Sequence, residues 1–192
     1  SPANHRLNHN NAVFEPHLQG CRPSSEGWKK ERCIKVHTNI HANEGVPSDI
    51  KFTSAATSDS FMLKPTNYSD GDILAIDRAY IDYAKFEELT QRSVVYVTKM
   101  KKGLVYELLP DKMHMTLEGL MESREQKVRF TKRMAGGETI KHTARIITYV
   151  DLNKKTPKLV SLLTNDLDID REEIIAVYRK RWAIELLFKQ LK

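Results

Sequence analysis

The chain has 192 residues, of which 40% are hydrophobic, and this is enough for one domain with a real core. Its 31 lysines and arginines exceed its 25 acidic residues, so the net charge of +6 is compatible with a polyanionic partner. Two cysteines and no membrane-length or signal-like apolar segment argue against a disulfide scaffold and a membrane protein. We therefore expect a reduced, cytoplasmic protein with no membrane partner.

Residues 1–32 form a weakly patterned N-terminal segment, which we interpret as the remnant of a first core strand and a loop. Its clearest strand signal is Ala12-Val13-Phe14. Metal-competent side chains also gather in and after this segment, at Cys21, Cys33, His37 and His41. The cysteines are much farther apart than in a zinc knuckle, and His37 sits in an alternating strand pattern. Structural zinc is therefore the weaker interpretation of these residues.

Residues 33–98 alternate between strand and helix signals and predict a core. The predicted elements are the antiparallel strands Ile34–Ile40 and Pro47–Ser54, a short helix Asp59–Leu63, a strand Ile73–Ile76, a helix Tyr80–Gln91 and a strand Ser93–Thr98. The run Ile73–Ile76 is apolar throughout, as in a central strand buried on both faces. It ends at Asp77, and the carboxyl ends of such strands are where open α/β sheets place their chemistry. The alternative is that Asp77 only caps or turns the chain.

Residues 99–166 predict a β-rich insertion ahead of the last helix. Its short strands are expected at Leu104–Leu109, Lys127–Arg133, Ala144–Asp151 and Leu159–Thr164. Basic residues cluster at 99–102, at 127–133 and in the last helix. A charge run is usually a solvated face, but three such clusters favour a nucleic-acid partner.

Residues 167–192 predict a long helix, because residues 168–192 contain no glycine or proline and Asp170 with Glu173 forms a capping-box pattern. At about 100° per residue, one polar arc runs between two apolar flanks. This arc contains Tyr178, Arg181, Glu185, Lys189 and Lys192. We expect the flanks to pack, the arc to line a groove, and Arg179, Lys180 and Gln190 to face water. The alternative is a solvated face on which Glu185 pairs with Arg181 or Lys189.

Two motifs resemble those of a known family. The spacing Tyr178-x2-Arg181-x3-Glu185-x6-Lys192 resembles the Tyr-Arg-Glu-Lys signature of DDE transposases of the insertion-sequence-four family. The segment Asp77-Arg78-Ala79-Tyr80-Ile81-Asp82-Tyr83 is similar to their Asp-x-Gly-Tyr-x-Asp-Tyr/Phe motif, with Ala79 replacing the usual glycine. The resemblance implies an α/β, RNase H-like fold of the retroviral-integrase type, with a β-rich insertion before the helix that carries the glutamate.

The resemblance also implies chemistry and partners. Asp77 and Glu185 would be catalytic carboxylates that hold two Mg²⁺ or Mn²⁺ ions, because hard cations prefer oxygen ligands. The reaction would be DNA strand cleavage and joining in transposition of a bacterial insertion sequence, with the protein at the nucleoid. Its partners would be the terminal inverted repeats, bound by a homodimer. The residues expected at the DNA are Tyr178, Arg181, Lys189, Lys192, Arg78 and Tyr80.

The first catalytic aspartate of the family is the main departure. The resemblance places it within Pro2–Asn11, where the nearest analogues are asparagines at positions 8, 10 and 11. Asp49 and Asp59 sit on the wrong elements to replace it. We therefore expect a truncated or degenerate copy that is inactive alone. The alternatives are a non-catalytic DNA-binding remnant and a β-rich protein-interaction domain.

Overall fold

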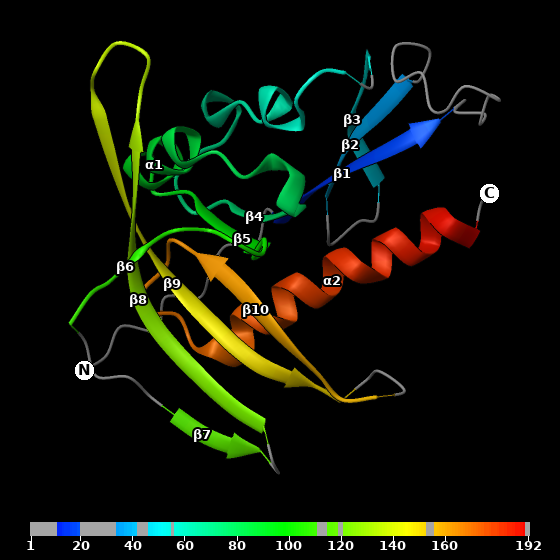
Figure 1. Ribbon diagram of the computed structural model, residues 1–192. Coiled ribbons are helices and arrows are strands. Elements are labelled where there is room, and N and C mark those ends of the chain that lie inside the picture. Colours follow the sequence, from blue (N-terminus) through cyan, green and yellow to red (C-terminus); the bar gives the residue numbers. More distant parts are fainter. Residues whose placement is uncertain are drawn as a thin grey trace, which may run out of the picture.

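The computed structural model describes residues 11–19, 34–41, 46–54, 56–110, 115–118, 121–152 and 156–190. Within these ranges it describes the backbone alone at residues 11–19, 34, 41, 46, 48, 115–118, 121, 122 and 183–190. The strands in these ranges form one mixed sheet of ten strands. Its order is β3-β2-β1-β4-β5-β10-β9-β8-β6, and β7 pairs with β8 (Figure 1). No helix in the described ranges is long and apolar enough to cross a membrane.

One half of the sheet combines antiparallel and parallel strands. Strands β1 (Asn11–Gln19), β2 (Ile34–His41) and β3 (Val46–Ser54) are antiparallel neighbours. Strand β4 (Ile73–Ile76) pairs in parallel with β1, and β5 (Val95–Lys99) pairs in parallel with β4. The strands predicted around β2, β3, β4 and β5 are confirmed. The turn predicted between β2 and β3 lies outside the described residues.

The other half extends the same sheet from β5. It consists of β6 (Glu107–Leu108), β7 (Met115–Glu118), β8 (Met121–Arg133), β9 (Thr139–Asp151) and β10 (Lys158–Thr164). Strand β10 pairs antiparallel with β5, so the two halves are continuous. Strands β8 and β9 form a long hairpin whose turn uses Gly137 at a φ of 87°, which favours glycine. The six-residue strand predicted at Leu104–Leu109 is wrong in length, because only two of its residues pair with β8.

The helices begin at polar caps. Helix α1 (Tyr83–Gln91) follows Asp82, whose side chain accepts a hydrogen bond from the amide of Ala84 at 3.0 Å. The predicted start at Tyr80 is therefore three residues early, and Arg78–Tyr80 is a 3-10 turn instead. Two more 3-10 turns occupy Asp59–Met62 and Pro65–Asn67. Helix α2 (Arg171–Gln190) begins where the carbonyl of Asp170 accepts hydrogen bonds from two amides of the first turn.

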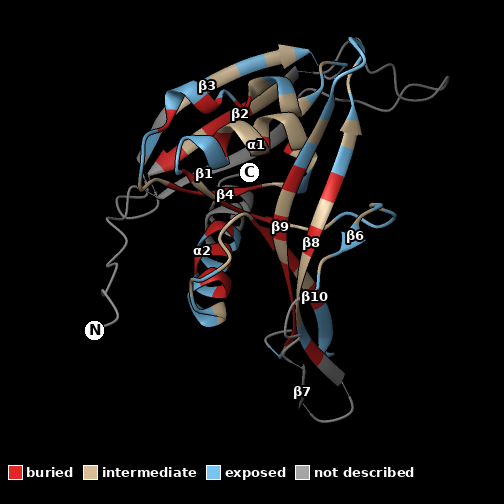
Figure 2. Ribbon diagram, turned by 90° about the vertical axis from the view of Figure 1, so that its left-hand side faces the viewer, coloured by how far each residue is buried: buried red, intermediate tan, exposed pale blue. Residues whose placement is uncertain are grey.

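The two helices cover opposite faces of the sheet, because alternate residues of each strand point to opposite sides. In β4, Leu74 and Ile76 pack in one buried cluster with Phe86 of α1. Ile73 and Ala75 pack in the other cluster with α2 residues. Figure 2 shows buried residues in β4 and along one side of α2. Asp77, the next residue after Ile76, therefore falls on the face that carries α2.

Helix α2 presents one apolar side to the sheet. Its buried apolar residues are Ile174, Ile175, Val177 and Tyr178. Arg179 and Lys180 are exposed, as predicted. Trp182, which the helical spacing places in an apolar flank, is 39% exposed, so the expected packing of that flank is incomplete at this residue.

Candidate catalytic site at the end of β4

Asp77 immediately follows β4, and its two carboxylate oxygens have different partners. Oδ1 accepts a hydrogen bond from the backbone amide of Ala79 at 2.7 Å and so caps the 3-10 turn Arg78–Tyr80. Oδ2 lies 3.6 Å from Nη1 of Arg181 in α2. Asp77 thus does cap the chain, as the simpler interpretation held. It also presents a second oxygen toward α2, where the carboxylate remains partly exposed.

Arg181 and Tyr178 form the α2 side of this contact. Nη2 of Arg181 donates to the hydroxyl oxygen of Tyr178 at 3.2 Å, and the guanidinium carbon lies 4.9 Å from the centre of the Tyr178 ring. Both residues are buried, and Arg181 is only 2% exposed. A buried guanidinium needs a counter-charge, and Asp77 supplies one from the described residues. The contact therefore ties the end of β4 to the middle of α2.

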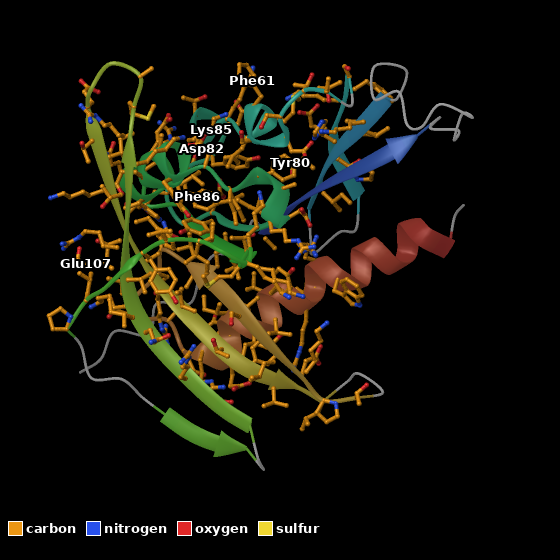
Figure 3. All side chains as sticks on the ribbon, in the orientation of Figure 1. Phe61, Tyr80, Asp82, Lys85, Phe86 and Glu107 are labelled. Atoms are coloured by element: carbon orange, nitrogen blue, oxygen red, sulfur yellow. The ribbon has the colours of Figure 1, made fainter. Side chains whose placement is uncertain are left out.

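Tyr80 fixes the turn after Asp77 from the other face of the sheet. Its hydroxyl oxygen lies 2.6 Å from Nδ1 of His37 in β2, and Nε2 of His37 lies 2.8 Å from Oγ1 of Thr53 in β3. Tyr80 is labelled in Figure 3, beside the turn that follows β4. Burial lowers the pKa of His37, with Asp59 opposing this effect. The imidazole is therefore neutral at pH 7, with one ring nitrogen donating and the other accepting.

The backbone of β1 brings a second acidic residue to the level of Asp77. The parallel pairing of β1 with β4 runs from Asn11 opposite Ile73 to Phe14 opposite Ile76. One residue farther along each strand stand Glu15 and Asp77. Neighbouring strands lie about 4.8 Å apart. The register therefore places an acidic residue beside Asp77, although the first carboxylate was expected within Pro2–Asn11, a window of which only Asn11 is described.

The third acidic residue, Glu185, lies in α2 four residues after Arg181. Residues four apart share one face of a helix, so the backbone of Glu185 is one turn from the Arg181–Asp77 contact. Its side chain lies outside the described residues. Both interpretations of Glu185, as a catalytic group and as a salt-bridge partner on a solvated face, therefore remain predictions. Lys189 also lies on α2, whereas Lys192 is outside the described residues.

Three of the residues expected at the DNA are buried. Tyr80 is fully buried and hydrogen-bonded to His37, and Tyr178 and Arg181 pack between α2 and the sheet. Tyr178 and Arg181 lie on the side of α2 that faces the sheet, whereas Tyr80 lies in the turn after β4. The expected DNA contacts of these three side chains stay predictions. Arg78, which directly follows Asp77, is exposed.

Asp77 offers a donor that suits a divalent cation. Carboxylate oxygens are the ligands that Mg²⁺ and Mn²⁺ prefer, and Asp77 has one oxygen that no backbone amide holds. Among the side chains that the structure describes, no group of three histidine, cysteine or acidic residues surrounds a metal position. The zinc candidates Cys21 and Cys33 lie outside the described residues, and both nitrogens of His37 already contact hydroxyl groups.

A comparison with protein families places this chain in one of them. Residues 14–192 match the family model described as the transposase DDE domain. The chain belongs to this family. As a DDE transposase domain, it comes from a group of enzymes that cut and transfer nucleic-acid strands and generally use divalent metal ions. The matched range includes Glu15, Asp77 and Glu185, and the mixed sheet with few helices is consistent with an RNase H-like domain.

Curated relatives agree with this family. A protein of Sinorhizobium fredii named as a transposase is 24% identical over 172 residues, which are 86% of this chain and 47% of the relative. A protein of Synechocystis named as an insertion-sequence transposase is 25% identical and covers 83% of this chain and 43% of the relative. A protein of Geobacillus stearothermophilus, also named as an insertion-sequence transposase, is 24% identical and covers 83% of this chain and 40% of the relative. This DDE domain thus spans less than half the length of the relatives it matches.

Proposed function

We propose that this chain is the catalytic domain of an insertion-sequence-four-type transposase, which cleaves and joins DNA strands by two-metal phosphoryl transfer. One observation carries the proposal: the parallel register sets Glu15 beside Asp77, and Asp77 contacts Arg181 one helical turn from Glu185. This arrangement of the backbone supports a site to which β1, the end of β4 and α2 each contribute one acidic residue. Family membership and the relatives named as transposases support the same reaction.

Glu15 is our candidate for the position of the first carboxylate, which we expected to be empty. We predicted a degenerate copy, inactive alone, because Pro2–Asn11 contains no acid. The register with β4 instead supports Glu15 as the first carboxylate. Glutamate is one methylene longer than the aspartate of the family and keeps the same charge and oxygen ligands. We therefore propose that this domain retains a complete set of three acidic ligands.

Each protein group has a distinct part in the reaction. Two Mg²⁺ or Mn²⁺ ions, when bound, would activate the attacking oxygen and stabilise the leaving oxygen at phosphorus. Asp77 offers Oδ2 to a cation while the amide of Ala79 fixes Oδ1, so this carboxylate is oriented before a cation arrives. Glu15 and Glu185 would complete the ligands from β1 and α2. The buried bond between Tyr80 and His37 holds the turn that orients Asp77.

The proposed DNA partner is the pair of terminal inverted repeats, bound by a homodimer. Arg78 is exposed beside Asp77, and Lys189 and Lys192 follow Glu185 along the chain, so these three residues would seat phosphates near the reacting strand. The strands β6 to β10, between β5 and α2, would be the β-rich insertion of the insertion-sequence-four type. In this chain they extend the central sheet through β10.

A nicking assay tests the proposal. Supercoiled plasmid is incubated with Mn²⁺ and with the domain or its variants Glu15→Gln, Asp77→Asn and Glu185→Gln. Glu138→Gln, an exposed residue at the tip of the β8–β9 hairpin, is the matched control. We expect Mn²⁺-dependent nicking by the domain and the control, and a loss of at least about 100-fold in each site variant, the size of effect seen when one well-placed catalytic group is removed. DNA binding without nicking by the unaltered domain would favour the non-catalytic alternative.

A further inference from the structure

The far end of the β8–β9 hairpin has no third strand beside it among the described residues. Strand β10 pairs with β9 only from Arg145 onward, and β6 pairs with β8 only at Val128 and Arg129. Residues 130–142, which we call the outer hairpin, therefore pair only with each other and project beside α1 (Figure 1). A two-stranded hairpin is marginally stable by itself. The outer hairpin therefore depends on its contacts with α1.

Two of these contacts lie at the start of α1. The ring of Tyr83 stacks on Phe130 of β8, with the ring centres 4.5 Å apart. Nζ of Lys132 lies 3.1 Å from Oδ1 of Asp82, the residue that caps α1. This ion pair is partly exposed, so it contributes little to the free energy of docking.

A third contact is buried and can change its protonation state. Nδ1 of His142 in β9 lies 3.0 Å from Oε2 of Glu87 in α1, and Nε2 lies 2.7 Å from the hydroxyl oxygen of Tyr96 in β5. The imidazole and Tyr96 are fully buried. We propose that these three residues form a proton-sensitive contact, which keeps the outer hairpin docked on α1 while His142 is neutral. This inference does not depend on the proposed reaction.

The partners of His142 set the order of the protons. A carboxylate only accepts hydrogen bonds, so Nδ1 carries the hydrogen that points to Glu87. In a neutral imidazole Nε2 is then an acceptor, and the hydroxyl of Tyr96 donates to it. Burial raises the pKa of Tyr96 well above its ordinary value of 10, so this hydroxyl keeps its proton. All three groups are therefore satisfied in the neutral state.

Protonation of His142 breaks this order. Nε2 becomes a donor, the hydroxyl of Tyr96 must accept, and its own hydrogen is left without an acceptor among the described residues. Burial lowers the pKa of His142, although the bond to Glu87 opposes this effect. The docked state is therefore favoured above about pH 6.5 and weakens as the pH falls toward the folded-state pKa. The titratable or charged groups on the elements around His142 are Glu87 and Tyr83 on α1, Tyr96 on β5, and Lys132 on β8 with its partner Asp82.

Hydrogen–deuterium exchange of the domain at pH 7.5 and pH 5.5, followed by mass spectrometry, tests the inference. After correction for the intrinsic effect of pH on exchange, the outer hairpin and α1 should lose protection at pH 5.5 by between about threefold and tenfold, because an exposed imidazole is mostly protonated there. Protection in α2, on the opposite face of the sheet, should change by less than about twofold. Equal losses in all elements, or no loss at all, would overturn the inference.

His142→Gln removes the titrating group, and its amide can still donate to Glu87 and accept from Tyr96. Protection of the outer hairpin and α1 in this variant should not depend on pH between 7.5 and 5.5. Lys141→Gln is the matched control, because it changes the exposed neighbour in β9, and it should keep the pH dependence of the unaltered domain. A full pH dependence in His142→Gln would contradict the role of His142.

A measurement on the unaltered domain covers the case in which His142→Gln does not fold. Nitrogen-15 NMR of the His142 ring at pH 7.5 distinguishes its two neutral forms from the charged form. We expect a neutral ring that carries its hydrogen on Nδ1, because Nδ1 faces Glu87. A hydrogen on Nε2, or a charged ring, would overturn the proposed proton order and with it the inference.

Discussion

Tyr80→Phe tests how the turn after Asp77 is held. The change removes one hydroxyl from a fully buried ring and leaves Nδ1 of His37 without the partner that it has at 2.6 Å. An unsatisfied buried polar group costs about 1–3 kcal/mol of unfolding free energy. The ring itself, and its edge-on contact with His37, remain. Because about 1 kcal/mol shifts the midpoint of a chain of this size by about 2–4 °C, we expect a fall of about 4–8 °C for a loss of about 2 kcal/mol.

The assay is urea denaturation at pH 7.5, followed by circular dichroism, with a melting curve on the same samples. Tyr106→Phe is the matched control, because Tyr106 packs edge-on against Phe130 and no hydrogen bond of its hydroxyl occurs among the described residues. We expect the control to change the unfolding free energy by less than about 0.5 kcal/mol. DNA affinity should be the same for Tyr80→Phe and the unaltered domain under conditions in which both are folded. Unchanged stability together with weakened DNA binding would refute the buried role of Tyr80.

Three further predictions concern stability. Burial lowers the folded-state pKa of His142 below its ordinary value of 6.5, and the bond to Glu87 opposes this effect. The neutral imidazole therefore stabilises the fold above about pH 6.5, and the free energy of unfolding should decline as the pH falls toward the folded-state pKa. His142→Gln should show a smaller loss between pH 7.5 and 5.5 in urea denaturation, and an equal loss would contradict this. Leu162→Ala, at a fully buried position, should cost about 2–5 kcal/mol in the same assay, whereas Leu159→Ala, 47% exposed, should cost less than about 1 kcal/mol. Arg145→Met should cost about 1–3 kcal/mol, because the side chain bonds Glu125 and the carbonyl of Ile169 just before α2, and a change below about 0.5 kcal/mol would count against that anchor.

Much of the sheet, and both motifs, could be predicted from the sequence. Alternation located β2 and β3, and the apolar run Ile73–Ile76 located β4, because these local patterns reflect which faces are buried. The Asp77 motif and the spacing around Glu185 pointed to the family that the comparisons then showed. These features depend on residues that are close together in the sequence, so a single sequence is enough to predict them.

The register of β1 could not be predicted from such local patterns. Glu15 becomes a candidate metal ligand only because β1 pairs with β4. That pairing joins segments about sixty residues apart in the sequence, between Phe14 and Ile76. The strand signal at Ala12–Phe14 was visible, but no local pattern sets it at one level with Asp77. The window predicted for the first carboxylate, Pro2–Asn11, therefore does not include Glu15, the residue that we propose for that role.

The burial of Tyr178 and Arg181 in the polar arc of α2 also depended on tertiary contacts. The helical spacing grouped Tyr178 and Arg181 on one side, but it did not say whether that side faces water, DNA or the sheet. An arginine near a carboxylate is usually solvated. Here Arg181 is buried, and it contacts Asp77 and the ring of Tyr178. Tyr80, which the resemblance puts at the DNA, is buried and bonded to His37 of β2, a contact between residues far apart in the sequence.

The central claim is that Glu15, Asp77 and Glu185 together hold the divalent cations of one site. Replacing Mg²⁺ with Fe²⁺ and adding ascorbate and peroxide generates radicals that cut the backbone next to the bound ion, and mass spectrometry then locates the cuts. We predict cuts in three segments of the folded domain, around Glu15 in β1, around Asp77 after β4 and around Glu185 in α2, all suppressed by excess Mg²⁺ and by Asp77→Asn. Cuts near Asp77 without any in β1 would contradict the claim that Glu15 completes the site.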